Sequence, residues 1–348
     1  MRRNQKRSIA ARFTARLIAA LTFVGIRHTA VARDFDPALV ARAKAEGRLT
    51  LYSTFSGNQL HAAIKKGYED LFGIPVDMLM ARSSEVYERV RVEVAAGRSS
   101  GDVMLQGEAS TQRMASDGLV QTTNGFTGAA RLAVGDPAYR IAAPAFINGY
   151  GLMVNANLVR SEDEPKSWLD LLDAKWTGKM LADDMRALGS GGMFFAVTVE
   201  KLGIDYQKKL AAQKLVFGRD IGADQLRVAR GEFPLRFPQS LSNMRDLKGL
   251  PLRFAIPKEG LPYIRIDAAI IKGSTRPNAA HLFAEYMLAP QTQNMLAGFG
   301  LVPVIKGAVN APDRETSELV SRARDNLMGT FRPDIQEAML ALAKETYK

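Results

Sequence analysis

The segment from Leu181 to Gly203, LADDMRALGSGGMFFAVTVEKLG, places charged side chains directly before a predicted helix. Asp183, Asp184 and Arg186 come first, and a glycine–serine cluster precedes an apolar run with helical spacing. A helix N-terminus offers unpaired amide donors and the positive end of the helix dipole, and arginine adds a fixed charge. The segment therefore suits a small-anion site, although the same residue types also serve as ordinary helix caps and turns.

The composition offers few residues for a catalytic or metal centre. The 348 residues include no cysteine and three histidines, which are His28, His61 and His281. No disulfide and no thiolate metal site can form, and neither His61 nor His281 lies in a recognisable nucleophile motif. We therefore predict a protein that is not an enzyme and that carries no cofactor and no metal site.

The positive charge is concentrated at the N-terminus. Residues 1–32 carry seven basic and no acidic residues, and removing those seven charges from the formal +11 leaves +4. The later basic residues alternate with acidic ones, as in KKGYED, which is typical of a solvated helix face. This distribution predicts no nucleic-acid partner.

The N-terminal segment has the pattern of a secretory signal peptide. Its basic part ends at Arg16, the apolar part Leu17–Ile26 follows, and Ala30-Val31-Ala32 is a small-x-small cleavage pattern. The apolar part is well short of the ~20 residues of a membrane-spanning helix. We expect residues 1–32 to be removed and the protein to act in the periplasm; an uncleaved amphipathic helix is the alternative.

Extended and helical patterns alternate along the rest of the chain. The extended segments Arg48–Asn58, Ile74–Ala81 and Gly101–Gly107 are each followed by an amphipathic helical segment. This order predicts an α/β fold with a parallel sheet that is covered by helices. A longer extended segment, Tyr139–Val159, suits a crossing between two lobes.

The order of the motifs resembles that of a known family. The carriers are EGRLTLYSTFS, LFGIPVDML, SSGDVMLQGEAS, NGYGLMVNANLV, PKSWLDLLDAKWTGKMLADD and RPNAAHLFAEYMLAPQTQNMLAGFGLVPV. Together they resemble the type II periplasmic solute-binding proteins of ABC importers, in the group of the ferric-ion binders. The resemblance implies a ligand bound between two α/β lobes, each a mixed sheet flanked by helices, that are joined by β-strand hinges. It also implies an ABC permease of the inner membrane as the partner of a monomeric protein.

On this basis the chain divides into four parts. Residues 33–142 and 264–305 are expected to form lobe 1, and residues 143–263 lobe 2. Residues 306–348 are expected to form C-terminal helices that pack on the lobes, and residues 1–32 the signal peptide.

The candidate ligand-binding residues follow strands or begin helices, because ligands of open parallel sheets lie at the carboxyl ends of the strands. They are Thr54, Ser56, Ser83, Ser84, Gln106, Glu108, Tyr150, Asp184, Arg186, Ser190, Gly191, Gln239 and Tyr263. Each of them can equally be a cap, a turn or a core residue. Thr54, Ser83, Ser84, Arg186, Ser190 and Gly191 rank highest, since they supply donors with little competing negative charge.

The donor set favours an organic or phosphorus oxyanion over iron. Ferric members of the resembling group carry an adjacent tyrosine pair, and the matching window Arg236–Asn243 contains no tyrosine. Hydroxyls, glycine amides and an arginine suit a carboxylate or a phosphate or phosphonate ester. Ferric iron bound without the tyrosine pair, using Glu108, Asp184 and Tyr263, remains an alternative, as does an enzyme on the same scaffold.

Overall fold

The computed structural model describes residues 34–55, 58–187, 189–218, 220–307 and 309–348. The predicted signal peptide therefore lies outside the described residues. Within the described residues, no helix is long and apolar enough to cross a membrane. The first helix is α2 (Pro37–Glu46), which Asp36 caps by accepting hydrogen bonds from the amides of Ala38 and Leu39. It ends at Gly47, whose φ of +83° favours glycine.

Lobe 1 begins with parallel strands that alternate with helices. Strand β1 pairs with β2 on one side and with β3 on the other, and both pairings are parallel. The predicted strand–helix alternation is therefore confirmed. The bounds are β1 Leu49–Ser53, α3 Asn58–Phe72, β2 Val76–Met80, α4 Ser83–Ala95, β3 Val103–Gly107, α5 Glu108–Ser116 and the 3-10 helix η1 Thr127–Arg131.

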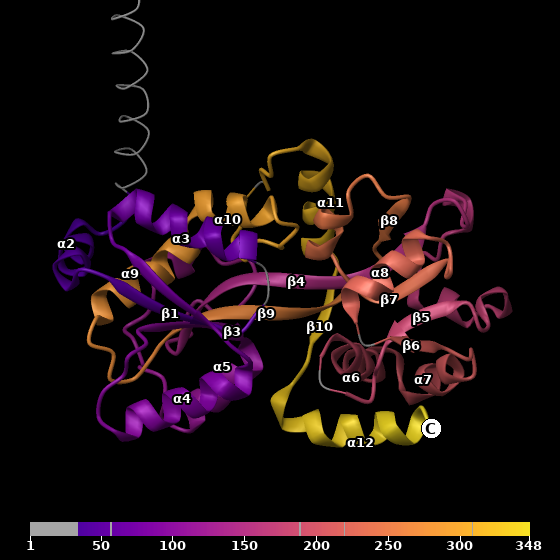
Figure 1. Cartoon of the computed structure of the whole chain (residues 1–348), viewed down its shortest axis with the longest axis horizontal. Helices are drawn as coiled ribbons and strands as arrows, with labels where there is room; N and C mark the ends of the chain where they lie inside the picture. The colour runs from indigo at the N-terminus through magenta and orange to yellow at the C-terminus, as the bar shows by residue number, and fades with distance from the viewer. Residues whose placement is uncertain (1–33, 56–57, 188, 219, 308) are drawn as a thin grey trace, which may run out of the picture.

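Two long strands, β4 (Ala142–Asn155) and β9 (Leu261–Ile270), run from one half of the molecule to the other (Figure 1). The first part of β4 pairs with β9, and its second part pairs with β7 and β8, all in the antiparallel sense. The result is one continuous strand order, β2-β1-β3-β9-β4-β7-β5-β6, with β10 beside β9 and β8 beside β4. The crossing that Tyr139–Val159 predicts is therefore present as β4.

Lobe 2 lies at the other end of β4. Its strand β5 pairs in parallel with β6 and β7. The strands are β5 Met180–Asp183, β6 Val216–Gly218, β7 Leu235–Ser240 and β8 Leu252–Ala255. The helices are α6 Ser190–Leu202, α7 Ile204–Ala211 and α8 Ile221–Ala229, with 3-10 helices η2 Ser161–Asp163, η3 Trp168–Leu172, η4 Ala174–Trp176 and η5 Ser242–Leu247.

The remaining elements return to both lobes. Helices α9 (Pro277–Met287) and α10 (Pro290–Ala297) lie in lobe 1. The C-terminal elements are α11 Arg314–Arg324, β10 Leu327–Thr330, η6 Pro333–Ile335 and α12 Gln336–Thr346. Figure 1 shows β10 running between α11 and α12.

The hydrophobic cores follow the two halves. One large cluster joins the helices and strands of the first half and includes Val320 and Ala323 of α11. A separate cluster around Trp168 and Phe194 belongs to the second half, and there Ala343 of α12 and Tyr347 are buried. This packing supports the expected lobes and places α11 on lobe 1 and α12 on lobe 2; the exact boundaries stay a prediction.

Candidate functional site

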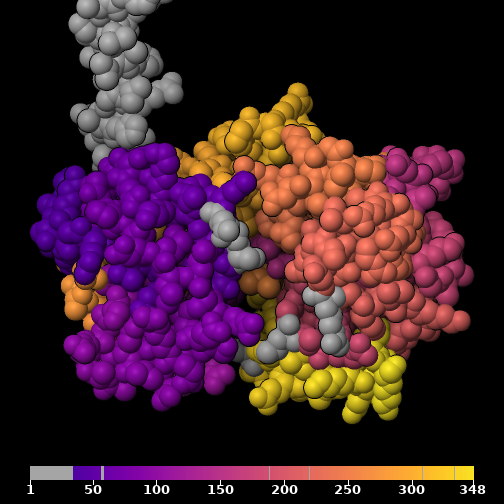
Figure 2. All heavy atoms as spheres, viewed as in Figure 1, coloured from indigo at the N-terminus to yellow at the C-terminus, as the bar shows by residue number. Residues whose placement is uncertain are grey.

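A cavity of about 520 Å³ lies between the two lobes. Figure 2 shows the hollow between the indigo-to-purple half and the orange half. Lobe 1 contributes Thr54, Ser83 and Glu108 among others, and the crossing strand β4 contributes Phe146. Lobe 2 contributes Tyr150, Gly189, Met193, Ser242 and Asn243. Thr330, Phe331 and Gln336 add a wall from the C-terminal segment. Residues far apart in the sequence therefore meet around one solvent-accessible space.

Several helices begin at this cavity. Helix α4 begins at Ser83, α5 follows its N-cap Gly107, and α6 follows its N-cap Gly189, and all three residues line the cavity. The N-cap residues of α5 and α6 are glycines, so neither of these described residues caps its helix with a side chain. Unpaired amides and the positive dipole ends of these helices make the cavity favourable for negative charge.

A hydrogen-bonded group on the lobe 2 side orients Tyr150. The Asn148 side-chain oxygen accepts hydrogen bonds from Ser240 Oγ at 2.9 Å and Ser242 Oγ at 3.2 Å. This fixes the amide so that Asn148 Nδ2 donates to Tyr150 Oη at 3.2 Å. Burial, with the nearby charge of Asp183, raises the pKa of Tyr150 to about 12. The phenol is therefore neutral at physiological pH and can donate its own proton to a ligand.

A charged cluster lies on the lobe 1 side. Arg265 Nε donates to Asp267 Oδ1 at 2.8 Å, and Arg265 Nη2 lies 3.2 Å from Asp267 Oδ2. The same Nη2 lies 2.9 Å from Glu108 Oε1. Burial raises the pKa of Asp267 to about 6, although the charge of Arg265 opposes this shift.

The raised pKa of Asp267 predicts a pH-dependent stability. An acid whose pKa is higher in the folded protein binds more protons there, so the free energy of unfolding falls as the pH rises from about 4 to about 6. One such group contributes a slope of up to about 1.4 kcal/mol per pH unit. The free energy of unfolding of the wild type and of Asp267→Asn can be measured by urea denaturation over this pH range. The slope of this free energy against pH should be less negative in the variant, and equal slopes would contradict the assignment.

Four of the predicted ligand-binding residues line the cavity: Thr54, Ser83, Glu108 and Tyr150. Ser83 Oγ lies 3.0 Å from Ser110 Oγ, which joins the starts of α4 and α5. Ser56 lies outside the described residues. Contact of these residues with a ligand stays a prediction that their placement supports.

The structure does not place the other predicted residues on the cavity lining. Gln106 and Gln239 are fully buried, Ser84 is exposed beside the cavity-lining Ser83, and Tyr263 is half-buried in β9. Gln106 Nε2 donates to Met114 Sδ, and Gln239 Oε1 accepts from Arg236 Nη1. These side chains point into the lobes because strand residues alternate between faces.

The residues before α6 are engaged with lobe 2 itself. Arg186 forms hydrogen bonds with both carboxylate oxygens of Asp184 and with the backbone carbonyl of Tyr347, and its guanidinium lies over the Phe217 ring. Ser190 Oγ donates to Asp183. Gly191 is buried against the backbone of Asp183 and Asp184. The start of α6 reaches the cavity through Gly189 and Met193 instead, and Arg186 is not among the lining residues.

Other lining residues were not among the predicted ones. They include Phe55, Ser110, Phe146, Arg265 and Gln336. Phe146 lies on β4 and Arg265 on β9, in the part where these strands pair. A search for polar and aromatic residues on the crossing strands themselves, and not only after strand ends, would have found these two.

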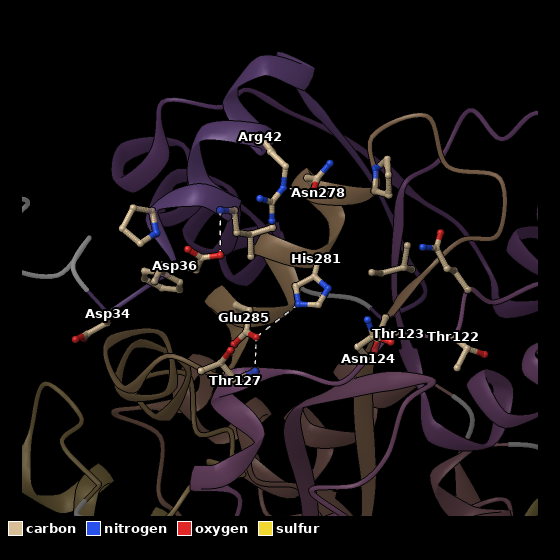
Figure 3. A pocket seen from close by; sticks show the side chains of 16 residues that line it. Asp34, Asp36, Arg42, Thr122, Thr123, Asn124, Thr127, Asn278, His281 and Glu285 are labelled. Atoms are coloured by element: carbon tan, nitrogen blue, oxygen red, sulfur yellow. Dashed lines mark hydrogen bonds and ion pairs between the residues drawn. The ribbon is translucent and has the colours of Figure 1, made fainter.

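A larger cavity of about 670 Å³ lies within lobe 1, between α2, α9 and the loop before η1 (Figure 3). The Glu285 carboxylate accepts hydrogen bonds from the amides of Thr127 and Gly128 and lies 3.6 Å from His281 Nε2. These groups tie the loop to α9. Because one lobe supplies the whole lining, a ligand there would not favour lobe closure, and we place the candidate site in the cleft.

The acidic residues suggested as an alternative iron site are separately engaged. Glu108 pairs with Arg265, and Asp184 pairs with Arg186. Within the part of the chain that the structure describes, no three His, Cys, Asp or Glu residues form a group that could hold a metal ion.

Two lobes, crossing strands and a ligand-sized cleft define a periplasmic-binding-protein fold, and comparisons with known proteins agree. The chain is similar to iron-bound HitA from Pseudomonas aeruginosa, with a TM-score of 0.68 and 21% identity over 86% of this chain and 99% of HitA. It is also similar to the periplasmic binding protein AfuA from Actinobacillus pleuropneumoniae with bound fructose-6-phosphate, with a TM-score of 0.63 and 19% identity over 86% and 98% of the two chains.

The sequence comparisons establish the family. The chain belongs to the bacterial extracellular solute-binding proteins, whose family model matches residues 99–324. It is also 23% identical to an uncharacterised protein of Haemophilus influenzae over 278 residues. This match covers 74% of this chain and 78% of that protein. The two-lobed fold and the resemblance expected from the sequence motifs are confirmed.

Proposed function

We propose that this protein is exported to the periplasm, captures a small organic anion in the cleft and delivers it to an ABC permease of the inner membrane. The observation that carries the proposal is the convergence of the helix starts at Ser83, Gly107 and Gly189 on one cavity. Helix N-termini bind carboxylates and phosphates through their free amides and dipoles. A carboxylate or a phosphate or phosphonate ester is therefore the ligand class.

The lining also suits the organic part of such a ligand. Phe55, Phe146, Met193, Leu301 and Phe331 supply apolar surface around the polar groups. Binding sites for small organic molecules combine mainly apolar walls with a few placed polar groups. A bare inorganic ion would leave this apolar surface in contact with water.

Ferric iron is the second candidate, because iron-bound HitA shares the fold. Iron prefers anionic oxygen ligands, an extension of the rule that hard metals select hard donors. The phenol of Tyr150 is held neutral by its raised pKa, and the Glu108 carboxylate is paired with Arg265. These two features favour the organic anion over iron.

Ligand binding would favour closure of the cleft because both lobes contribute contacts. A ligand that touches Ser83 of lobe 1 and Tyr150 of lobe 2 makes all of these contacts only when the lobes are close. The closed form then gains population by the difference in binding free energy between the two forms.

Native mass spectrometry of freshly purified protein tests the proposal. We expect a bound organic anion that also raises the melting temperature when it is added back to the ligand-free protein, since binding to the folded state alone stabilises it. Bound iron without an organic anion would overturn the proposal. Chemical conversion of the added compound would favour the enzyme alternative.

Tyr150→Phe should weaken the binding of the compound that co-purifies by about two- to tenfold, because one neutral hydrogen bond contributes about 0.5–1.5 kcal/mol. Isothermal titration calorimetry gives the affinity. Tyr87→Phe is the matched control, because the Tyr87 hydroxyl bonds to Asp117 at an exposed position. Equal affinities of the two variants would remove the Tyr150 hydroxyl from the site.

A further inference from the structure

The cluster of Arg265, Asp267 and Glu108 constrains the charge of the ligand, given the function proposed above. A single guanidinium faces two carboxylates in this cluster. Arg265 is bidentate with Asp267, at 2.8 Å and 3.2 Å, and it also reaches Glu108 at 2.9 Å. One cation does not neutralise two anions, so the cluster keeps a net negative charge.

The excess negative charge lies at Glu108. Both oxygens of Asp267 are taken up by Arg265, and its side chain is fully buried. Glu108 Oε1 forms an ion pair with Arg265 Nη2 at 2.9 Å and accepts a hydrogen bond from Gln112 Nε2 at 3.2 Å. Among the described residues, Glu108 Oε2 receives no hydrogen bond. The Glu108 side chain is 19% exposed and lines the cavity, so a ligand in the cleft can approach its carboxylate.

Other groups near Glu108 do not cancel this charge. The start of α5 supplies about half of a positive charge, which leaves the cluster negative. Among the described residues that line the cavity, Arg265 and Glu108 are the only charged ones. The helix starts favour an anionic group, but a ligand that carried only negative charge would also meet repulsion from Glu108.

We propose that the ligand carries a cationic group, such as an ammonium, in addition to its anionic group, and that Glu108 is the residue that selects for it. The anionic group meets the start of α6 and the Tyr150 hydroxyl on lobe 2. The cationic group meets Glu108 on lobe 1, where it completes the neutralisation of the two carboxylates. Such a zwitterion bridges the lobes with opposite charges at its two ends.

Matched pairs of probes that differ only in the ammonium group test this proposal on the wild-type protein. The pairs are phosphoethanolamine with ethyl phosphate and β-alanine with propionate, each added to ligand-free protein and measured by thermal shift and calorimetry. At least one ammonium-bearing probe should bind at least about tenfold more tightly than its partner, because it gains one charge-assisted hydrogen bond. Equal binding within both pairs, or no binding by either ammonium-bearing probe, would overturn the proposal.

Glu108→Gln should abolish the preference for the ammonium-bearing probe while it leaves the partner probe bound as before or more tightly. Glu164→Gln is the matched control, because Glu164 also pairs with an arginine, Arg253, and its side chain is 18% exposed, but it lies outside the cavity. A preference that survives in Glu108→Gln would contradict the assignment of Glu108. Binding of ethyl phosphate or propionate without any preference would refute the zwitterion and leave the proposed capture of an anion standing.

Discussion

Arg236→Leu is expected to lower the free energy of unfolding at pH 7 by about 3–5 kcal/mol, as measured by urea denaturation. Arg236 is 1% exposed and pairs with Asp183 beneath the start of α6. Its Nη1 also donates to the carbonyl of Pro238 at 3.1 Å and to Gln239 Oε1 at 2.8 Å. Removing the guanidinium leaves the buried Asp183 carboxylate with its hydrogen bond from Ser190 but without its cation, and it removes the donor of two buried acceptors.

The effect of Arg236→Leu should depend on pH. Burial already raises the pKa of Asp183 against the opposing charge of Arg236, and without that charge the pKa rises further. An acid with a raised pKa in the folded state destabilises the protein as it ionises, so the variant should regain stability as the pH falls from 7 towards 4. The double variant Arg236→Leu with Asp183→Asn should recover part of the loss at pH 7.

Arg91→Leu is the control for Arg236→Leu. Arg91 also pairs with a carboxylate, Glu88 at 2.7 Å, but both side chains are more than half exposed. Exposed ion pairs contribute at most about 1 kcal/mol, and we expect a change no larger than that. Equal losses in the two variants would contradict the structural importance of the buried pair.

The sequence predicts the elements of the fold well, because their signals are local. The predicted strands Ile74–Ala81 and Gly101–Gly107 contain the observed β2 and β3, and the helical segment expected after Ile74–Ala81 is observed as α4. The first predicted strand, Arg48–Asn58, is too long at its C-terminal end, since β1 stops at Ser53. Apolar periodicity fixes the type of an element more firmly than its ends.

The sequence predicts the candidate site in part, for the same physical reason. Ser83 and Glu108 begin helices, and the first turn of a helix after a parallel strand lies at the ligand-binding edge of the sheet. The positions of Phe146 and Arg265 at the site depend on the pairing of β4 with β9, which joins residues more than a hundred positions apart and has no local signal.

Arg186 illustrates the opposite error in a local argument. It follows a strand and precedes a glycine-rich helix start, which is the setting of many anion sites. Its guanidinium is instead engaged by Asp184 and by the carbonyl of Tyr347, the penultimate residue of the chain. The sequence alone does not show that the C-terminus packs on α6 and α7.

Gly191→Ala is expected to lower the free energy of unfolding by at least about 3 kcal/mol, at the upper end of the usual cost of overpacking. A Cβ atom at Gly191 would lie 2.5 Å from the carbonyl oxygen of Asp184 and 2.9 Å from that of Asp183. Both contacts are with backbone, so no side chain can turn aside, and the start of α6 would have to move away from the end of β5.

Gly222→Ala is the matched control for Gly191→Ala, because each glycine is the second residue of its helix. A Cβ at Gly222 would meet only Asp220 Oδ1, at 3.6 Å, which is an ordinary contact. Alanine has the higher helix propensity, so this variant should be neutral or more stable by up to about 1 kcal/mol. Urea denaturation of both variants separates the close backbone approach from helix propensity, and a stable Gly191→Ala protein would show that α6 does not need this approach to reach the cleft.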